Sequence, residues 1–539
     1  MNWDRVKSPS FLAGLGVFAG SLALYLSTIA PTLSWGVDEV GVDGGELLAA
    51  ANTLGVPHPP GYPTYMLLLK AFGMIVPLGD FAFRGNLLSA VLTTTAALMV
   101  YAATLRLCRS LGPEAPAAMA VIGASLAGAA FAASHIPWSL AVVTEVYALN
   151  ALLAGALLLI IVRLLLPKSD GRRDRRSENR SLAAFGGLLG IGLGNHLTLL
   201  AVAVPLLYWT GSSLGLRRLA SPWLIAPFII GLSVYIYVPL SAASNPPINW
   251  GSADTFGGVF WLLTARAYQG YVFGVAAGDI FDRGLVWAKL VFSQFNALGL
   301  FVGLLAVGPL RKIEPRFLLA SAASIAIISL YSITFNSVDF HVLMVPALLL
   351  FSVWLGFGFF WIATTRIIGT TVKQPNPSNG HRRLGVSYQG LALGTLAFVL
   401  IPGVSVALNY GSNSLTTDNA AFDRGAEIID SVRDGSVVLG LHERNVFSSW
   451  YIRYVEKPDR DVAVIAVRLL QFDWYARSIH TLFPDRVPEI ESTDVSVAIR
   501  SIVEHNAGRA SVYFTFKNPS LTGGYDLEPV GSVWEATPR

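Results

Sequence analysis

The 539-residue chain is predicted to be an α-helical polytopic membrane protein with a small extracytoplasmic α/β domain at its carboxy end. Hydrophobic residues make up 53% of the chain and charged residues only 13%, and the mean hydropathy is +0.55. Apolar windows of about 20 residues recur over the first three quarters, which is the length that a helix needs to cross the hydrocarbon core. After about residue 409 these windows stop and short β-rich runs begin.

The charge and cysteine content exclude two classes of protein. The net charge of +4 does not indicate a nucleic-acid partner, because the basic residues fall in short loops between the apolar windows. The single cysteine, Cys108, excludes an intramolecular disulfide and a cysteine-based metal site. No other residues stand at metal-ligand spacing, so no cofactor is predicted, although the acids described below are compatible with a divalent metal.

The apolar windows define the predicted spans. The first follows "MNWDRVK"; it is longer than a signal-peptide core and lacks a small-residue cleavage site, so we interpret it as a retained helix. The windows lie at about 12–30, 86–106, 117–136, 141–165, 183–210, 221–240, 286–309, 317–335, 342–364 and 387–408.

Charge alternates from one connecting segment to the next. One set is rich in Lys and Arg, and the positive-inside rule places such loops in the cytoplasm. These segments are "MNWDRVK", "RLCRSLG", "PKSDGRRDRRSENRS", "GLRRLAS", "LRKIEPR" and "TTRIIGTTVKQPNPSNGHRR". The other set has few basic residues and is predicted on the opposite face; it contains "VDEVGVDGGE", "HPPGYP", "ASHIPWS", "NPPINWG" and "FNSVDFH".

The window at 183–210 has basic loops on both sides, so a single crossing would invert every later loop. Its centre, "GLGNHLTLL", predicts that the chain enters and returns as two short half-helices around Asn195 and His196. About eleven crossings result, with the amino terminus cytoplasmic. We therefore expect a multi-pass protein of the cell membrane, with a transmembrane domain over residues 1–408 and an extracytoplasmic domain over 409–539.

The carboxy-terminal domain alternates amphipathic helices with short β-rich runs. The order of a helix, "SVVLGL", a helix and "DVAVIAV" predicts parallel strands joined by a crossover helix. It contains no glycine-rich phosphate loop.

Between the first two windows, the segment "DGGELLAAANTLGVPHPPGYPTY" places two acids, a histidine and four prolines beside the membrane. Prolines and glycines at this density stop a helix, and a carboxylate is costly next to hydrocarbon, so the segment must lie at an interface or in a wet cavity. Asp43 and Glu46 are the candidate catalytic acids. The alternative is that they only cap a helix that begins here.

His58 and Tyr62, in the same loop, are candidate substrate-binding residues. Two prolines follow His58 and hold it extended, so that it faces whatever the loop covers; the alternative is a turn histidine bonded to the backbone. The next segment, "PTYMLLLKAFGMIV", is short for a span and is expected to lie along the outer interface as an amphipathic helix.

Further polar residues fall near the outer ends of the predicted spans. An acid at such a position is a functional-site hypothesis, and the alternative for Glu145 is a structural hydrogen bond to a neighbouring helix. A guanidinium at the outer face can hold a phosphate with two bonds, so Arg266 is a candidate phosphate ligand or, alternatively, a partner for an exposed acid. The outer set is Glu145, Tyr147, Asn195, His196, Asn249, Arg266 and Asp339.

The expected outer cavity contains carboxylates, a histidine and an arginine, and hydrophobic helices form its walls. Such a cavity suits a substrate with a phosphate head and a lipid tail. Transfer of a sugar from such a carrier needs one carboxylate to deprotonate an acceptor hydroxyl while cationic or dipolar groups hold the departing phosphate.

Several motifs together resemble a known membrane family that includes a vertebrate protein O-mannosyltransferase and is related to GT-C-type glycosyltransferases. They are "PTLSWGVDEVGVDGGELLAAANTLGVPHPPGYPTY", "WSLAVVTEVYALNA", "GLGNHLTLL", "YVPLSAASNPPINWG" and "SSWYIRYVEKPDRDVAVIAVRLLQFDWYARSI". The resemblance implies a GT-C fold whose first outer loop carries the catalytic acid, here Asp43 with Glu46 beside it. It assigns donor-head or loop-support roles to the "EVY" and "GNH" positions.

Two positions depart from the pattern that the resemblance implies. Gly44 stands where relatives have a small hydroxyl residue, and Ser241 stands where they often have a basic one, which places more weight on Arg266 as the phosphate ligand. The expected function is inverting transfer of a sugar, with mannose as the first candidate, from a polyprenyl-phosphate carrier to an extracytoplasmic protein or glycan acceptor. The alternatives are a transporter and a non-catalytic membrane assembly subunit with the same fold.

Overall fold

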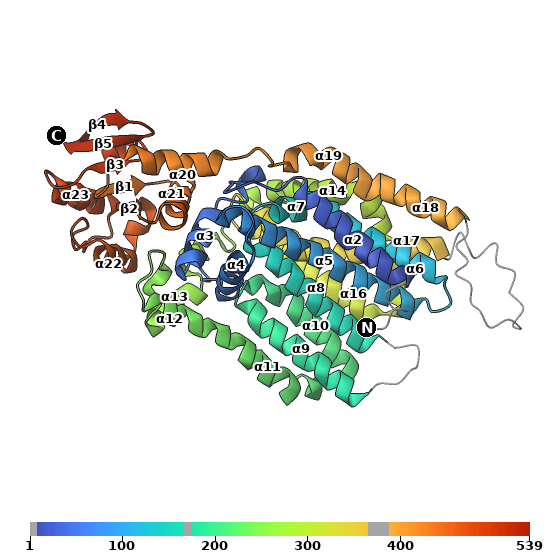
Figure 1. The fold of residues 1–539 in the computed structure, drawn as a ribbon. Helices are drawn as coiled ribbons and strands as arrows, with labels where there is room; N and C mark the ends of the chain where they lie inside the picture. Colours follow the sequence, from blue (N-terminus) through green and yellow to red (C-terminus); the bar gives the residue numbers. More distant parts are fainter. Residues whose placement is uncertain (1–7, 167–173, 365–387) are drawn as a thin grey trace, which may run out of the picture.

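The computed structural model describes residues 8–166, 174–364 and 388–539. It is an elongated molecule with a long helical bundle and a smaller sheet domain at one end (Figure 1). Within the described residues, nine helices are long and apolar enough to cross a membrane, or ten if one bent pair counts as a span. They are α2 (Pro9–Leu26), α5 (Phe81–Leu111), the bent pair α6 (Ala117–Ala133) and α7 (His135–Ala141), α8 (Val146–Leu165), α10 (Leu200–Leu214) with the turn before it, α11 (Pro222–Leu232) continuing into α12 (Tyr237–Ala242), α14 (Ile280–Leu304), α16 (Pro315–Thr334), α17 (Val345–Ile362), and α18 (Tyr388–Phe398) with α19 (Val404–Asn413).

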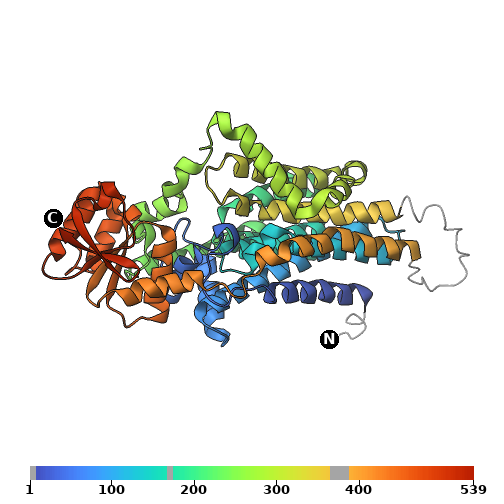
Figure 2. The ribbon, with the colours of Figure 1, turned by 90° about the horizontal axis from the view of Figure 1, so that it is seen from above.

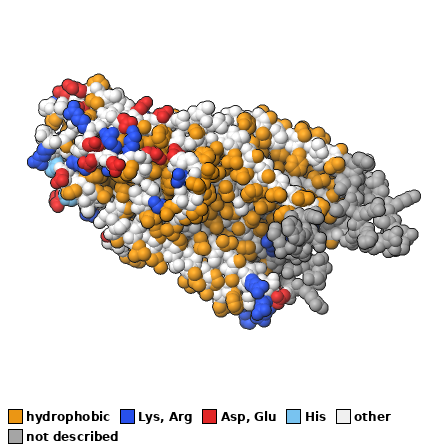
Figure 3. Space-filling view, viewed as in Figure 1, with side chains coloured by type: hydrophobic (Ala, Val, Ile, Leu, Met, Phe, Trp, Pro, Cys, Tyr) orange, Lys and Arg blue, Asp and Glu red, His pale blue; other side chains and the backbone are white. Residues whose placement is uncertain are grey.

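Helix α17 lies at the centre of the bundle. Of its most apolar window, 94% is buried inside the protein, whereas the windows of α2 and of α11 with α12 are only 22% buried. A helix that is apolar on all sides must face either protein or lipid, so these outer helices present their apolar surface to the bilayer. Figure 3 shows the same division, with hydrophobic side chains over the bundle and charged ones gathered mainly on the sheet domain. The predicted multi-pass membrane architecture is confirmed.

The prediction of two short half-helices around Asn195 and His196 is wrong. Helix α9 (Arg175–Leu193) has 19 residues, and α10 with its preceding turn forms an apolar unit of 18 residues. Such helices are roughly 27 to 29 Å long, close to a bilayer core. Helix α9 is not among the apolar candidate spans, because its first turns carry "RRSENRS". The turn between the two helices forms where "GNH" predicted it, and the count of about eleven crossings remains a prediction.

The positions of two basic segments in the structure agree with the predicted alternation of charge along the chain. The basic last turns of α5 and the start of α9 lie at the end of the bundle away from the sheet domain (Figure 1). The first basic segment, the "PKSDGRR" part of the segment before α9, and nearly all of the last basic loop lie outside the described residues.

The sheet domain confirms the predicted parallel strand pair. Strand β1 (Ser436–Gly440) runs parallel to β2 (Val462–Ala466), with Ser436 opposite Val462, and α21 (Glu443–Tyr451) is the crossover helix. The sheet order is β2-β1-β3-β5-β4, and β5 pairs antiparallel with both β3 and β4, which the sequence pattern did not predict. The other elements are α20 (Ala420–Ser431), α22 (Asp473–Leu482), α23 (Val495–Asn506), α24 (Pro519–Thr522), β3 (Val512–Phe514), β4 (Tyr525–Val530) and β5 (Val533–Pro538). The division between residues 408 and 409 remains a prediction.

Short elements fill the space between the bundle and the sheet domain, as Figures 1 and 2 show. The loop before α4 pairs with the segment after α12, since the Val56 N–H donates to the Ile248 carbonyl at 2.8 Å and the Trp250 N–H to the Val56 carbonyl at 3.0 Å. The elements are α3 (Gly44–Thr53), α4 (Pro63–Ile75), α13 (Phe256–Leu263), the 3-10 turns η5 (Trp250–Ser252) and η6 (Arg266–Tyr271), and, on the bundle, α15 (Val307–Ile313).

Candidate active site

Two acids and one imidazole from the segment between α2 and α4 form a single cluster. The Nδ1 atom of His58 is hydrogen-bonded to Oε2 of Glu46, and its Nε2 atom lies 3.7 Å from Oδ2 of Asp43. The Tyr62 hydroxyl is 3.0 Å from the same Nε2 atom and donates to the Pro59 carbonyl at 3.3 Å. The segment that interrupts the apolar pattern therefore folds back so that His58 contacts both acids.

Exposure separates the two acids. The side chain of Glu46 is 0% exposed, that of His58 is 10% exposed, and that of Asp43 is 39% exposed. Only Asp43 therefore presents a carboxylate that an incoming hydroxyl can meet. Glu46 can act on a ligand only through His58.

The structure does not show the capping roles that were the alternative for these acids. Helix α3 begins at Gly44, and the side chain of Asp43, at its N-cap, accepts no capping hydrogen bond. The bonded oxygen of Glu46 goes to His58, and its other oxygen is buried without a partner among the described residues. Both carboxylates are thus directed toward the cluster rather than toward the helix amides.

Glycine is required where α3 meets the sheet domain. A Cβ atom on Gly45 would lie 2.4 Å from the carbonyl oxygen of Phe447 in α21, which is backbone and cannot rotate away. Asn52 donates to the Tyr454 carbonyl at 3.1 Å, and the Tyr451 hydroxyl accepts from the Ala82 N–H at 3.2 Å. The sheet domain therefore lies directly against the loop that carries the acids.

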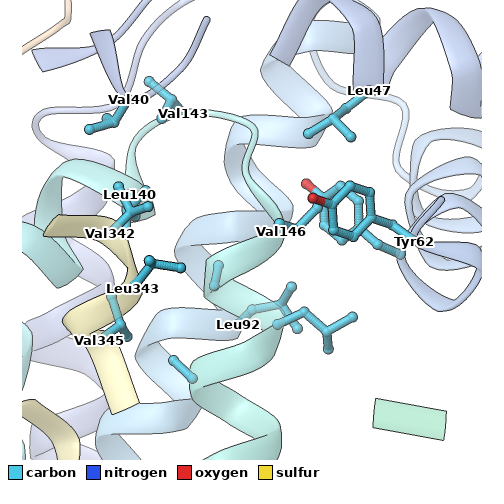
Figure 4. Packing of buried hydrophobic residues seen from close by; sticks show 14 of the residues in the cluster. Val40, Leu47, Tyr62, Leu92, Leu140, Val143, Val146, Val342, Leu343 and Val345 are labelled. Carbon is cyan, nitrogen blue, oxygen red and sulfur yellow. The ribbon is translucent and has the colours of Figure 1, made fainter. Parts of the chain in front are cut away.

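The loop that carries His58 is anchored on the turn between α9 and α10. Tyr62 has a left-handed backbone with φ +42°, and Pro63 starts α4. Thr64 donates from its N–H to the Gly194 carbonyl at 3.0 Å and from its hydroxyl to the Ile191 carbonyl at 2.6 Å. Figure 4 shows Tyr62 among the packed hydrophobic side chains beneath the loop, with Leu47 and Val146 around it.

The cluster changes the proton affinity of its members. Burial alone would lower the pKa of His58, but the charges of Glu46 and Asp43 outweigh it and raise the pKa to about 10, so the ring is protonated at neutral pH. Although the Asp43 side chain is partly exposed, the protein around it displaces water and raises its pKa to about 7, against the opposing charge of His58. A carboxylate with such a pKa is matched to proton transfer near neutral pH.

The "EVY" and "GNH" positions meet at the amino end of α8. The side chain of Glu145 accepts from the Val146 N–H at 3.1 Å, and its own N–H donates to the Ser89 hydroxyl of α5 at 3.3 Å. The amide nitrogen of Asn195 donates to the Val146 carbonyl at 3.2 Å, while its amide oxygen is buried without a partner among the described residues. These contacts support the helix start. The bond to α5 comes from the Glu145 backbone, and the Glu145 carboxylate caps α8, so the expected side-chain hydrogen bond from Glu145 to a neighbouring helix is not what the structure shows.

His196 extends the cluster on the bundle side. Its ring lies 5.2 Å from that of Tyr147 and 6.1 Å from that of Tyr62, measured between ring centroids. Its Nδ1 atom accepts the Thr198 N–H at 3.2 Å, which leaves the proton of the neutral ring on Nε2. Burial and the charge of His58 lower the pKa of His196 to about 4. His196 is therefore a neutral hydrogen-bond donor and not a second cation.

Asn249 and Arg266 lie on the segment after α12, whereas Asp339 lies between α16 and α17 and accepts a hydrogen bond from the Ser337 hydroxyl. Asn249 donates to the Ala242 carbonyl at 3.2 Å, and its amide oxygen is buried without a partner among the described residues. Arg266 starts η6 and is exposed, and it forms no ion pair with any acid in the described ranges. The alternative that Arg266 pairs with an exposed acid is thus not what the structure shows.

Two residues that act on the cluster were not among the residues predicted from the sequence. The ring of Tyr268, in the same turn as Arg266, lies 6.2 Å from that of His58. Glu443, the first residue of α21, adds to the charges that raise the pKa of Asp43. The motif "TARAYQGY" contains Tyr268 and offered a local signal, whereas nothing near Glu443 indicates its distant neighbours.

The described residues contain no group of three or more His, Cys, Asp or Glu side chains arranged to hold a metal ion.

Comparison with known sequences confirms the family resemblance. Residues 43–213 match the family model for the N-terminal domain of the protein O-mannosyl-transferase TMEM260. The protein O-mannosyl-transferase TMEM260 of Mus musculus is 25% identical over 494 residues, which cover 87% of this chain and 64% of the mouse protein. The corresponding protein of Dictyostelium discoideum is 21% identical over 503 residues, 87% of this chain and 58% of its own length. The chain thus spans less than two thirds of these curated relatives.

Comparison with solved structures confirms the GT-C-type fold. The crystal structure of ArnT from Cupriavidus metallidurans bound to undecaprenyl phosphate has a TM-score of 0.55 at 13% identity, covering 98% of this chain and 97% of ArnT. The apo structure of ArnT gives a TM-score of 0.50 at 14% identity, with 97% and 96% covered. At this identity the likeness concerns the fold alone.

Proposed function

We propose that the protein is a membrane glycosyltransferase that moves a sugar, with mannose as the first candidate, from a polyprenyl-phosphate carrier to a hydroxyl of an extracytoplasmic acceptor. The observation that carries the proposal is the open carboxylate of Asp43 beside the buried pair of His58 and Glu46. An exposed carboxylate with a pKa of about 7, held at the end of a lipid-facing bundle, suits a base that serves a lipid-linked donor.

In the proposed reaction, Asp43 takes the proton of the acceptor hydroxyl. The oxygen attacks the anomeric carbon from the face opposite the phosphate, a new carbon–oxygen bond forms, and the bond from that carbon to the phosphate oxygen breaks. The polyprenyl phosphate leaves with the bonding electrons, and the configuration at the anomeric carbon inverts. General-base assistance of this kind is worth about 10²- to 10⁴-fold in rate.

Glu46 and His58 are proposed as positioning residues for this base. The buried Glu46 carboxylate holds the protonated ring, and the ring charge lowers the proton affinity of Asp43. Without that charge the pKa of Asp43 would be higher, so the carboxyl would hold its proton more tightly. Glu46 was predicted as a catalytic acid, and its 0% exposure supports an indirect role instead.

The donor phosphate is proposed to lie near Arg266 and the turn formed by Asn195 and His196. The exposed guanidinium of Arg266 has no ion pair among the described residues, and the neutral His196 ring has a free donor at Nε2. Tyr147 and Asn249 would line the approach to this phosphate. Ser241, where relatives are often basic, donates to the Leu54 carbonyl and supports the acidic loop instead.

The relatives support the choice of sugar and acceptor. Two curated relatives are named protein O-mannosyl-transferases, and a protein of the same fold has been crystallised with undecaprenyl phosphate. A mannosyl donor on a polyprenyl phosphate and a protein acceptor are therefore the first pair to test. The amino terminus is proposed to be cytoplasmic, with the sheet domain and the Asp43 cluster on the opposite side.

The proposal is tested by supplying the purified, full-length protein in lipid nanodiscs with synthetic polyprenyl-phosphate mannose and following release of polyprenyl phosphate. Release that depends on an added hydroxyl acceptor supports a transferase. Donor that binds but remains intact with every hydroxyl acceptor offered would instead indicate an assembly subunit. Passage of the intact donor sugar across the membrane, measured with the same protein in sealed proteoliposomes, would indicate a transporter.

A further inference from the structure

A pocket lies outside the Asp43 cluster, where the segment after α12 meets helix α22 of the sheet domain. Its volume is about 410 Å³, which is in the range of ligand-binding pockets. The segment after α12 contributes Gly251 and Asp254 to its lining, α13 contributes Gly257 and Trp261, and α22 contributes Trp474 and Arg477. No residue proposed for donor binding or catalysis lines it.

Aromatic rings connect this pocket to the cluster. The ring of Trp250 lies 6.2 Å from that of His58, and the ring of Trp474 lies 5.8 Å from that of Trp250. Trp261, on the far side, is 5.2 Å from Trp474. This series of packed rings brings the pocket close to the cluster, within reach of an acceptor that extends from Asp43.

The lining contains an indole N–H without a hydrogen-bond partner and two charged side chains without an ion pair among the described residues. The indole N–H of Trp474 is buried and has no hydrogen-bond partner among the described residues, and the side chain is only 8% exposed. Asp254 and Arg477 at the rim are exposed, and neither forms an ion pair within the described ranges. A buried donor without a partner is costly, so it indicates a ligand that accepts from it.

Two glycines in the pocket lining leave the backbone without side chains, so a ligand can approach it closely. A Cβ atom on Gly258 would lie 2.3 Å from the Ser252 carbonyl, so this turn excludes a side chain. At the adjacent Gly257 no heavy atom lies within 4 Å of the Cβ position, so the backbone is open to a ligand.

We propose that this pocket binds the polypeptide segment that flanks the acceptor hydroxyl, a proposal that rests on the transferase function above. A polypeptide carries charges of both signs, which match the unpaired Asp254 and Arg477, and backbone carbonyls, which match the free indole N–H of Trp474. An uncharged glycan matches the aromatic walls but leaves both rim charges unpaired.

The distance between His58 and the pocket determines which residues of the acceptor can reach the pocket. Two ring-to-ring steps separate His58 from Trp474, so the straight-line distance between these two rings is at most about 12 Å. An extended polypeptide covers about 12 Å in three or four residues. The pocket is therefore expected to recognise the acceptor three to four residues away from the modified Ser or Thr.

The test compares two acceptors on the full-length protein in nanodiscs with polyprenyl-phosphate mannose as donor. One acceptor is a blocked single threonine, and the other is a pool of nonapeptides with one central threonine and randomised flanks. We expect Asp254→Asn with Arg477→Gln, which removes both rim charges, to raise the KM of the nonapeptides about threefold to tenfold and to leave the blocked threonine unchanged. Arg509→Gln, which removes an exposed charge on the same domain outside the pocket, is the matched control.

A second readout does not depend on activity. A photo-crosslinking amino acid at Thr481, on the pocket rim, should capture the nonapeptides, whereas the same group at the exposed Val497 of α23 should not. The proposal is overturned if both acceptors respond equally to the pocket variant, if neither responds, or if an oligosaccharide acceptor alone responds. If neither acceptor receives sugar, the proposed function fails and the crosslinking alone decides whether the pocket binds polypeptide.

Discussion

The Nε2 atom of His58 lies 3.7 Å from Oδ2 of Asp43, while the other ring nitrogen is hydrogen-bonded to Glu46. The ring therefore stands between one acid that is 39% exposed and one that is 0% exposed. Two acids that are three residues apart in the sequence thus receive different roles, because only Asp43 is open to a substrate.

The rate of sugar transfer is expected to rise with pH through about 7, the value to which the pKa of Asp43 is raised. A base must be ionised to accept a proton, and a raised pKa means that Asp43 still holds its proton below that pH. At pH 5 the rate should be about a hundredfold below its plateau, since the ionised fraction falls tenfold per pH unit. Initial rates of donor consumption between pH 5 and 9 at saturating donor measure this limb.

Replacement of His58 by Gln should move the same limb to higher pH. The charge of His58 lowers the pKa of Asp43, so its removal leaves the proton more tightly bound. A variant whose limb stays at the wild-type pH, or moves to lower pH, would show that another group titrates there.

Glu46→Gln should slow turnover by about tenfold, less than loss of the base, and should lower the free energy of unfolding by about 1–3 kcal/mol, because the buried, protonated ring of His58 loses its charged partner. The thermal midpoint in detergent and the turnover number are measured on the same preparation. A Glu46→Gln protein with wild-type thermal stability and no turnover would transfer the role of base to Glu46.

Gly45→Ala should weaken the contact between the acidic loop and the sheet domain. The added Cβ atom would lie 2.4 Å from the Phe447 carbonyl, so α3 and α21 must separate. Gly44→Ala is the matched control, because its Cβ atom would lie 3.3 Å from the Thr144 carbonyl and needs only a small adjustment. We expect the thermal midpoint and the turnover to fall for Gly45→Ala alone; equal losses in both variants would show that α3 tolerates no side chain at either site.

Cysteine labelling tests on which side of the membrane the sheet domain and the start of α9 lie. The native Cys108 is buried, so background labelling should be low. An impermeant maleimide applied to intact cells should modify Thr417→Cys, next to the sheet domain, and should spare Ser177→Cys near the start of α9. The reverse pattern would place the Asp43 cluster in the cytoplasm.

The architecture of the bundle could be predicted because it depends on length and composition. Windows of about 20 apolar residues and the alternation of basic loops are local signals that the bilayer enforces. The interpretation of 183–210 failed because the charged residues before Ser181 were counted as loop, whereas they form the first turns of α9. Hydropathy does not detect a helix that extends beyond the hydrocarbon.

The candidate site could be predicted only where its residues share one loop. Asp43, Glu46 and His58 lie in one unusual segment, and the structure confirms that they lie close together. The hydrogen bond between Glu46 and His58 depends on how the loop folds back, and the nearness of Glu443 depends on how the sheet domain packs. Neither has a signature in spacing or composition.

The most direct test of the central claim is the turnover of Asp43→Asn with polyprenyl-phosphate mannose and a hydroxyl acceptor. The amide keeps the size of the carboxylate and loses its basicity, so turnover should fall by about 10²- to 10⁴-fold. Binding of the donor, measured by its displacement of a fluorescent polyprenyl phosphate, should remain within about twofold of wild type, because the carboxylate is proposed to touch the acceptor. Near-normal turnover of Asp43→Asn would contradict the assignment of Asp43 as the base.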